Sequence, residues 1–408
     1  MLDQLDRIRL ALAVAVLASA PAAAQKTIEA PPVLLFDRDT LASNRQKLKE
    51  GDAGIGAAVA ALRKEADRAL AMRPPSVMDK PKTAASGDRH DYFSYGPYWW
   101  PDPTKPGGLP YIRRDGETNP ESKTGTDDHA FDDLTEAVET LGLAFWFTGD
   151  DRYARKAALL TRVWFLDPAT RMNPNFQHAQ AIPGVSPGRG IGLIESRQLM
   201  RVNEGLALLG GSPAWSAIDR TSYRAWLEKF YEWITTSPNG RDEAKAENNH
   251  GTWYDAQVAH LALRLNRNED ARKLLNGGIG RRLVAGIEPD GSQPKELART
   301  RSLSYSLFNL EALFTCARLG AHVGIDWWSY KSRDGRSLYQ AVSYVAPYLD
   351  AAKAWPKKDV DDVDRLRILP LVIEYVQHDD VPALHSLIPQ YLAKADPGAR
   401  WRLLYTLP

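Results

Sequence analysis

Two short segments carry residue types suited to acid–base chemistry. In the first, ENNHGTWY, Asn249 and His250 stand just before a glycine and an apolar helical stripe. An asparagine at a helix N-terminus caps free amides, and the positive end of the helix favours an anion there. An imidazole can move protons near neutral pH. We therefore predict an anion-holding amide beside a proton-transferring histidine. A merely capping Asn249 and a structural His250 are the alternative.

The second segment, 294–310, brings a tyrosine close to two arginines. Tyr305 lies about 200° around a helix from Leu303, so it does not point with the main apolar stripe. Arg301 is four residues earlier and shares its helical face, whereas Arg299 shares the site only if the chain bends or begins its helix there. A neighbouring arginine lowers the pKa of a phenol, which can then serve as an acid or a base. The alternative is a second packing face that an arginine covers.

Two loop segments have the composition of a sugar-binding groove. The segment 92–103, YFSYGPYWWPDP, puts aromatic rings on a loop punctuated by proline and glycine, where they stack on sugar faces or form a buried plug. The segment 173–190 combines amides and a histidine, which either line a polar groove or support the turns of a surface loop. The substrate-binding residues that we predict are Trp99, Trp100, Asn175, His178 and Gln180.

Helical periodicity must position these segments. Apolar residues recur at intervals of three and four in several stretches, and few runs alternate as strands do. The pattern predicts an all-α fold, either an (α/α) toroid or incomplete barrel of roughly six to seven helical hairpins or an α-solenoid. Residues 25–45 have the composition of a linker, and 74–128 that of a long loop, which in compact domains is usually functional. The predicted helical segments are 50–72, 131–148, 153–164, 195–209, 217–235, 254–265, 303–317, 334–350, 364–377 and 381–394.

The N-terminus has the features of an export signal. An apolar run of eleven residues, Leu10–Ala20, follows two arginines and is too short to span a bilayer. Small residues precede Gln25, which predicts cleavage after Ala24. We therefore predict a signal peptide at 1–24, a single domain at 25–408, and a periplasmic or secreted protein. A buried helix is the alternative interpretation of the apolar run.

Composition excludes several classes of protein. The 408 residues include 52 Lys and Arg and 51 Asp and Glu, a balance too even for general phosphate attraction. The single cysteine, Cys316, rules out an intrachain disulfide. Zinc-protease, phosphate-loop and serine-hydrolase motifs are missing, and the histidines lack metal-ligand spacing. We expect no metal, no cofactor, no nucleic-acid partner and no membrane insertion, and the sequence leaves the oligomeric state open.

Taken together, the motifs resemble the alginate lyase superfamily of polysaccharide lyases. The resemblance extends from Asp91 to Tyr305, and its aromatic loop makes the chain look closer to a uronate-polymer lyase branch than to the best-known alginate lyases. It implies an (α/α) toroid with a groove and β-elimination in a 1,4-linked uronic acid polymer, alginate or glucuronan. The motifs that carry it are DYFSYGPYWWPDP with LPYIRRDGETNPES, NPNFQHAQAIPG, ENNHGTWYDAQ and ELARTRSLSY.

The resemblance also implies roles for residues in this sequence. It assigns catalysis to Asn249, His250, Arg299 and Tyr305, although ideal helix geometry favours Arg301 over Arg299. In syn elimination Tyr305 serves as both base and acid, and in anti elimination His250 is the base; both routes stay open. The expected partner is an anionic polysaccharide. The rivals are a glycoside hydrolase, for which no convincing carboxylate pair is seen, and a non-catalytic periplasmic polysaccharide-binding protein.

Overall fold

A computed structural model describes residues 33–360 and 362–407 of the chain. The predicted signal peptide at 1–24 lies outside the described residues. The all-α prediction is confirmed, because helices make up most of the described structure and the strands are short. The α-helices are α1 (Arg38–Lys49), α2 (Ala53–Ala71), α3 (Asp128–Thr148), α4 (Asp151–Thr161), α5 (Leu199–Leu208), α6 (Ala217–Thr236), α7 (Pro238–Lys245), α8 (Asn249–Arg264), α9 (Asn268–Gly278), α10 (Pro294–Leu297), α11 (Ser302–Ala321), α12 (Leu338–Val345), α13 (Ile368–Tyr375), α14 (Pro382–His385) and α15 (Ile388–Leu392).

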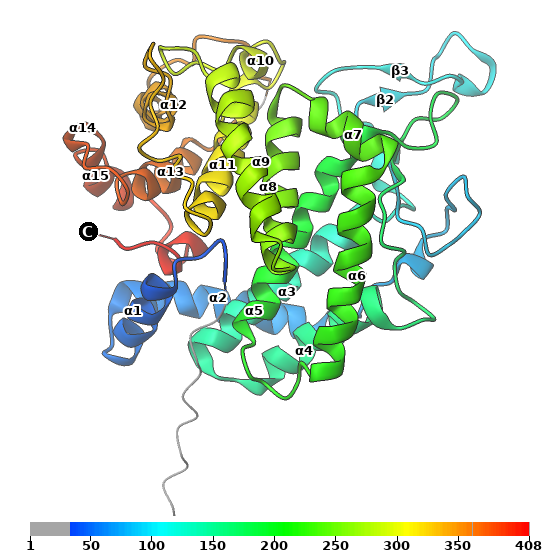
Figure 1. The fold of residues 1–408 in the computed structure, drawn as a ribbon, viewed down its shortest axis with the longest axis horizontal. Coiled ribbons are helices and arrows are strands. Elements are labelled where there is room, and N and C mark those ends of the chain that lie inside the picture. The colour runs from blue at the N-terminus through cyan, green and yellow to red at the C-terminus, as the bar shows by residue number, and fades with distance from the viewer. Residues whose placement is uncertain (1–32, 361, 408) are drawn as a thin grey trace, which may run out of the picture.

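The helices follow one another around an open ring (Figure 1). Helix α3 packs on α2, α4 and α5, helix α8 on α9 and α11, and α12 on α11 and α13. The C-terminal segment then returns to the first helices, where the Asn44 side chain donates to the carbonyl oxygen of Leu403 at 3.1 Å. Neighbours in sequence are therefore neighbours in space, as in a toroid built from helical hairpins.

Two apolar clusters fill the ring, and α8 belongs to both. Tyr254, Val258 and Leu261 face the cluster of the N-terminal half, whereas Ala256 and Ala259 face that of the C-terminal half. Helix α8 is consequently buried on almost every side along its length. Its first turn, which holds the predicted Asn-His pair, is fixed by packing from both halves of the molecule.

Helix ends follow local capping rules where the sequence contains a typical capping residue. Gly149 ends α3 in the left-handed conformation at φ 72°, and the side chain of Asp150 accepts from the backbone N–H of Arg152 to begin α4. The predicted stripe that starts at Phe131 is buried in α3. These local signals explain why the hairpin of α3 and α4 was predictable.

The linker prediction for 25–45 is wrong over its last residues. Helix α1 begins at Arg38 because Asp37 accepts from the backbone N–H of Thr40 at 2.7 Å, and Leu41 is fully buried. Helices α7, α9 and α10 were not predicted. Helix α9 is amphipathic but short, and α7 and α10 begin at prolines in polar stretches. The predicted helix at 195–209 begins as a 3₁₀ segment that covers Gly190–Gln198 before it becomes α5.

The long loop region folds over one end of the ring, with strands at its base. Strand β1 (Phe93–Tyr95) pairs in parallel with β4 (His178–Ala181), and β2 (Trp99–Trp100) pairs antiparallel with β3 (Ile112–Arg113). Figure 1 shows β2 and β3 at the same end as α7 and α10. The four predicted loop and helix motifs therefore meet at this end of the toroid.

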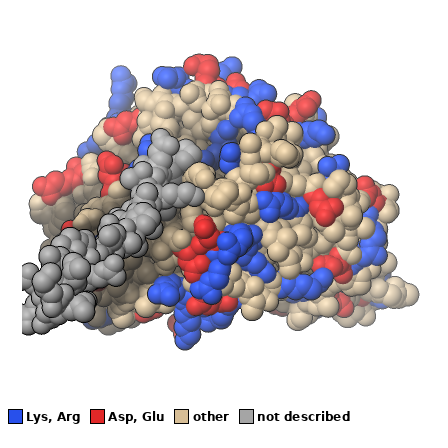
Figure 2. Space-filling model, turned by 90° about the horizontal axis from the view of Figure 1, so that it is seen from below, with Lys and Arg blue, Asp and Glu red and all other residues tan. Residues whose placement is uncertain are grey.

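The opposite face carries mixed charge. Figure 2 shows positive and negative side chains interspersed over the visible part of this face, with no extended region of one sign. Within the described residues no helix combines the length and the apolar character needed to cross a membrane.

A buried carboxylate on α5 joins the N-terminal segment to the core. Glu204 accepts from the backbone N–H groups of Leu34 and Leu35 at 2.9 and 3.0 Å, from His260 at 3.0 Å and from Arg264. Burial opposes ionisation of Glu204, but the charge of Arg264 and the hydrogen bond from His260 outweigh it and lower the pKa to about 2. One side chain thus stabilises four donors.

We expect Glu204→Ala to cost about 3–5 kcal/mol of unfolding free energy at pH 7, because it removes the buried carboxylate to which His260, Arg264 and two backbone amides donate. The pKa of Glu204 is lowered on folding, so its contribution is complete above the unfolded value of 4.5 and is lost as pH falls toward 2. Urea unfolding at several pH values measures both effects. Glu228→Ala, which removes a half-exposed glutamate paired with Arg224 on α6, should change stability by less than about 1 kcal/mol. An equal loss in the two variants would contradict this assignment.

Candidate active site

Tyr305 and Arg299 meet at the start of α11. The Arg299 guanidinium donates to the Tyr305 hydroxyl at 3.2 Å, and its central carbon lies 4.2 Å from the centre of the phenol ring. Arg301, which ideal helix geometry favoured, donates instead to the carbonyl oxygen of Gly116 at 2.6 Å. The structure therefore places Arg299 rather than Arg301 against the tyrosine hydroxyl.

The start of α11 explains this choice. Arg301 has non-helical backbone angles and precedes the first helical residue, Ser302. A carboxylate from a distant segment caps the helix, because Asp359 accepts from the backbone N–H of Leu303 at 2.6 Å. The chain bends before Ser302, so Arg299 approaches Tyr305 from outside the helix.

The loop after β3 holds Arg299 in place. Asp115 accepts from Arg299 at 2.9 Å and from Arg113 at 2.7 Å. Partial burial opposes ionisation of Asp115, but the hydrogen bond and charge of Arg299 prevail and lower the pKa of this carboxyl group. Gly116 follows at φ 82°, where a Cβ atom would come within 2.5 Å of the Thr300 hydroxyl. Glycine thus permits the close approach of the two segments.

A second tyrosine, from the aromatic loop, completes the contacts of Tyr305. The hydroxyl groups of Tyr98 and Tyr305 lie 2.8 Å apart. Burial, reinforced by the hydrogen bond with Tyr98, raises the pKa of Tyr305 in spite of the opposing charge of Arg299. Arg299 does act to lower this pKa, as expected from the sequence, but burial and Tyr98 outweigh it, and Tyr305 carries its proton at neutral pH.

Asn249 is held by a buried glutamate. The Glu296 carboxylate accepts from the backbone N–H of Asn249 at 2.6 Å and from its side-chain Nδ2 at 2.7 Å. Asn249 is the first residue of α8, and Asn248 is the N-cap. The free helix amide that the sequence suggested as an anion site is thus occupied by a protein carboxylate, which also engages one N–H of the buried Asn249 side chain.

His250 is oriented by a second buried glutamate. Its Nδ1 lies 2.8 Å from Oε1 of Glu243, a residue of α7 that is fully buried. A carboxylate can only accept, so Nδ1 carries the hydrogen and Nε2 keeps a free lone pair. Glu296, which binds the preceding residue Asn249, lies three residues before Arg299. The two halves of the predicted catalytic set are therefore linked through Glu296.

The predicted sugar-binding residues divide into two groups. Trp99 and Trp100 are half-buried on β2, and Gln180 is held on β4 in a left-handed conformation at φ 50°. Asn175 and His178 instead turn to a protein carboxylate: Asp91 accepts from Asn175 at 3.3 Å and lies 3.6 Å from the ring of His178. Their polar atoms support the loop, so a substrate-binding role for these two stays a prediction.

The buried-plug interpretation of the aromatic loop holds for part of it, and stacking on sugar faces stays a prediction. Tyr92 is fully buried among Phe131 and Phe176, which makes it part of a plug that fixes the loop. Tyr98, by contrast, reaches the predicted catalytic tyrosine. The sequence analysis missed four residues that contact the predicted set, namely Tyr98, Asp115, Glu243 and Glu296. All four lie in or beside its motifs, but their pairing depends on tertiary structure.

A buried acid supports the strand that bears Gln180. Glu195 accepts from the Tyr92 hydroxyl at 2.9 Å and from Ser94 at 2.6 Å, and Ser94 in turn accepts from the backbone N–H of Gln180 at 2.8 Å. Burial raises the pKa of Glu195 to about 7. The carboxyl group beneath the predicted groove is therefore partly protonated at neutral pH.

Because its pKa is raised on folding, Glu195 contributes stability that is complete below the unfolded value of 4.5 and is lost as pH rises through about 7. We expect this group to account for roughly 2–3 kcal/mol of lost unfolding free energy between those values, and Glu195→Gln to abolish that part. Denaturant unfolding at intervals from pH 4.5 to 8 checks it. Parallel profiles for the wild-type protein and the variant would disprove the assignment.

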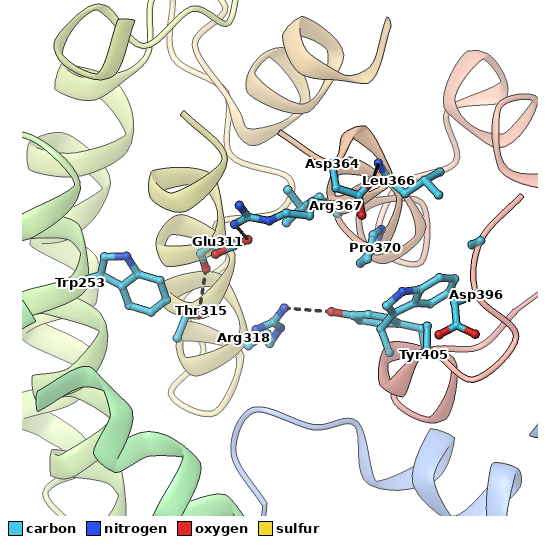
Figure 3. Close-up of a pocket in the computed structure, with 14 residues that line it drawn as sticks. Trp253, Glu311, Thr315, Arg318, Asp364, Leu366, Arg367, Pro370, Asp396 and Tyr405 are labelled. Carbon is cyan, nitrogen blue, oxygen red and sulfur yellow. Dashed lines mark hydrogen bonds and ion pairs between the residues drawn. The ribbon is translucent and has the colours of Figure 1, made fainter. Parts of the chain in front are cut away.

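A separate cavity of about 510 Å³ lies between α8, α11, α13 and the C-terminal segment (Figure 3). None of the predicted site residues lines it. Its ionic groups are satisfied within the chain, since Arg367 contacts Glu311 at 3.3 Å and Arg318 donates to Tyr405 at 3.3 Å. Trp253, on the next turn of α8 after His250, forms one wall. This cavity is part of the toroid interior and not of the predicted groove.

Fold and site together define a helical toroid with acid–base residues gathered at one end. The family model for alginate lyase matches residues 76–355, which is more than half of the chain. The crystal structure of an alginate lyase from Bacteroides ovatus is 37% identical to this chain, with a TM-score of 0.88 over 93% of this chain and 100% of that one. The chain therefore belongs to the alginate lyase family and is a polysaccharide lyase.

More distant solved structures share the fold alone. Alginate lyase A1-III from Sphingomonas species A1 is 18% identical, with a TM-score of 0.53 over 92% of this chain and 98% of that one. A histidine-to-alanine variant of A1-III complexed with a tetrasaccharide is also 18% identical, with a TM-score of 0.57 over 94% of this chain and 98% of that one. Among curated proteins, no match is found. The predicted toroid and family are confirmed, and the non-catalytic binding protein is not favoured.

The part of the chain that the structure describes contains no cluster of side chains that could bind a metal ion. Across residues 33–360 and 362–407, no group of three or more His, Cys, Asp or Glu side chains is arranged to hold an ion. The carboxylates nearest the predicted catalytic set are instead engaged by Asn249, His250 and Arg299.

Proposed function

We propose that the protein cleaves a 1,4-linked uronic acid polymer, alginate or glucuronan, by β-elimination. The observation that carries this proposal is the hydrogen bond from Asn249, the neighbour of His250, to Glu296, which lies three residues before Arg299. This contact brings a histidine oriented by Glu243 to the same end of the ring as a protonated tyrosine held by Arg299. The reaction needs a group to hold the uronate carboxylate, a base for the C5 proton and an acid for the C4 oxygen. The residues of this site supply one of each.

The chemical steps follow from the contacts. A base removes the C5 proton, the electron pair forms the C4=C5 double bond, the C4–O bond breaks, and the departing oxygen takes a proton. Tyr305 is the acid, because burial keeps its proton in place. The Asn249 side chain and the guanidinium of Arg299 stabilise the carboxylate as charge develops on it. The free Nε2 of His250 is a ready base.

The stereochemistry of the substrate decides whether His250 acts. When the C5 hydrogen and the C4 oxygen lie on opposite faces, His250 takes the proton and Tyr305 returns one to the leaving oxygen. When they lie on the same face, Tyr305 must do both: its phenol gives its proton to the departing C4 oxygen while the phenol oxygen takes the C5 proton, so the tyrosine ends protonated. This route requires substrate binding to release its hydroxyl from Tyr98. We propose both routes for this one site.

We further propose that residues 1–24 direct export to the periplasm or the medium and that 25–408 is one catalytic domain. The contact of the C-terminal segment with α1 supports one folding unit. Mass spectrometry of the protein recovered from the native host's periplasm and culture medium would test the cleavage site. An N-terminus at Gln25 is expected, and an intact Met1 would refute export through this signal.

The function is tested by following the ultraviolet absorbance of the new double bond. The protein from Gln25 onward is incubated with polymannuronate, polyguluronate, glucuronan and a neutral glucan. A rise with at least one uronate polymer and none with the glucan is expected. No rise with any of the three uronate polymers would overturn the proposed substrate class.

A further inference from the structure

One arginine near the predicted groove takes no part in the steps above. Arg189 follows β4, and its Nε donates to the backbone oxygen of Gln180 at 3.1 Å while its Nη2 donates to the Gln180 side chain at 2.8 Å. The guanidinium also lies 5.8 Å from the ring centre of Trp99. The left-handed backbone of Gln180, unusual for a residue other than glycine, turns both of its oxygens toward this one side chain. The arginine is thus held firmly from one side.

Arg189 forms no ion pair with the described part of the chain. Of the carboxylates in the described residues, none lies within 4.0 Å of its guanidinium, whereas Arg299 in the same region is paired with Asp115 at 2.9 Å. Burial, with a contribution from the charge of Arg113, outweighs the more distant charges of Glu195 and Glu243 and lowers the pKa of Arg189 to about 10. A largely buried cation whose hydrogen-bond partners are neutral is costly to maintain, and an incoming anion relieves that cost.

Backbone packing places Arg189 between the two halves of the catalytic set. On one side, a Cβ atom at the following Gly190 would lie 3.3 Å from the backbone nitrogen of Glu243, the residue that orients His250. On the other side, a Cβ atom at Gly96 would lie 2.8 Å from Nη2 of Arg189. Gly96 belongs to the loop that carries Tyr98 to the catalytic tyrosine. The guanidinium therefore lies against the loop that carries Tyr98, and the residue after Arg189 packs on the helix that carries Glu243.

We propose that Arg189 binds the carboxylate of a uronate residue adjacent to the one being cleaved, with Gln180 fixing the guanidinium and Trp99 lying against the sugar ring. This inference rests on the proposed function, since it names how the polymer's repeating charge is recognised. A planar guanidinium fits a carboxylate with two parallel hydrogen bonds. The arginine then selects for a charged neighbour and holds the chain in register. It is a specificity-determining residue that leaves the chemical step itself to others.

The test uses Arg189→Gln, Arg189→Lys and a matched control, Arg272→Gln, which removes an exposed arginine of α9 far from the strands. With the polyuronate that the wild-type protein cleaves, Arg189→Gln should raise KM about 10- to 100-fold and change kcat less than about twofold. Arg189→Lys keeps the positive charge but cannot form two parallel hydrogen bonds, so its KM should lie between that of the wild-type protein and that of Arg189→Gln. The control should match the wild-type protein.

Binding experiments separate recognition from turnover. In a Tyr305→Phe background, affinity for the intact polyuronate is compared with affinity for the same polymer after its carboxyl groups are reduced to alcohols. Adding Arg189→Gln should weaken binding of the charged polymer about 10-fold or more and leave binding of the reduced polymer within about twofold. Equal losses for both polymers would overturn the inference and indicate a packing role.

The possible failures are distinguishable. Absence of turnover and of binding by the wild-type protein refutes the proposed function. Wild-type turnover with an unchanged KM in Arg189→Gln refutes the role of Arg189 alone. If thermal unfolding shows that Arg189→Gln is not folded, Arg189→Lys tests the role of Arg189 instead. A wild-type KM in Arg189→Lys would contradict bidentate binding of the carboxylate.

Discussion

Tyr305→Phe should reduce kcat by about 10²–10⁴-fold on every polymer that the protein cleaves, with little change in substrate affinity. The hydroxyl is the group placed to protonate the leaving C4 oxygen, and general acid–base groups contribute about this much to rate. The ring itself remains, so stacking of Arg299 at 4.2 Å from the ring centre is preserved. Absorbance of the double bond measures kcat, and titration calorimetry with the same polymer measures affinity.

A control for this substitution is Tyr153→Phe, because Tyr153 lies on α4 and donates its hydroxyl to Asp67 at 2.8 Å, away from the site. It loses one hydroxyl as well, and should keep full activity. A Tyr305→Phe protein that retains more than about a tenth of wild-type kcat would show that another group, or water, protonates the leaving oxygen.

Tyr98→Phe gives the complementary information, because the Tyr98 hydroxyl hydrogen-bonds the proposed acid, Tyr305, at 2.8 Å. Removing this hydrogen bond withdraws one of the causes that raise the pKa of Tyr305, so that pKa should fall toward its ordinary value. The alkaline limb of the pH–rate profile for kcat/KM should therefore move to lower pH.

The type and number of site residues could be predicted from sequence more readily than their partners. Spacing within ENNHGTWY and the 294–310 segment indicated a histidine, an asparagine and a tyrosine. The choice between Arg299 and Arg301 depends on where α11 begins, and that point is set by a cap from Asp359, more than fifty residues later. No local rule contains this information.

Long-range carboxylates explain the other differences. Glu243 and Glu296 lie within or beside recognisable motifs, yet their roles arise only when α7 and α10 are folded against the first turn of α8. The sign of the pKa shift at Tyr305 was likewise beyond sequence reasoning, since it depends on burial and on Tyr98 from a loop some two hundred residues earlier. Helix periodicity, by contrast, is local, and it placed the main helices correctly.

His250→Ala should lower kcat on one class of substrate much more than on the other. Mannuronate and guluronate are epimers at C5, so the hydrogen that must leave lies on opposite faces of the two sugars relative to the C4 oxygen. The anti substrate, guluronate, needs a base on the face away from Tyr305, and only there is the free Nε2 of His250 required. We expect kcat on polyguluronate to fall about 10²–10⁴-fold and kcat on polymannuronate to fall far less.

Glu243→Gln refines this prediction, because it keeps a hydrogen bond to His250 while removing the charge that stabilises an imidazolium. We expect kcat on the anti substrate to fall about 10-fold, because the positive charge that the imidazole gains with the proton is no longer balanced. We expect kcat on the syn substrate to fall far less. Equal losses on both polymers in His250→Ala and Glu243→Gln would mean that the histidine holds the carboxylate in both reactions, and that Tyr305 is base and acid throughout.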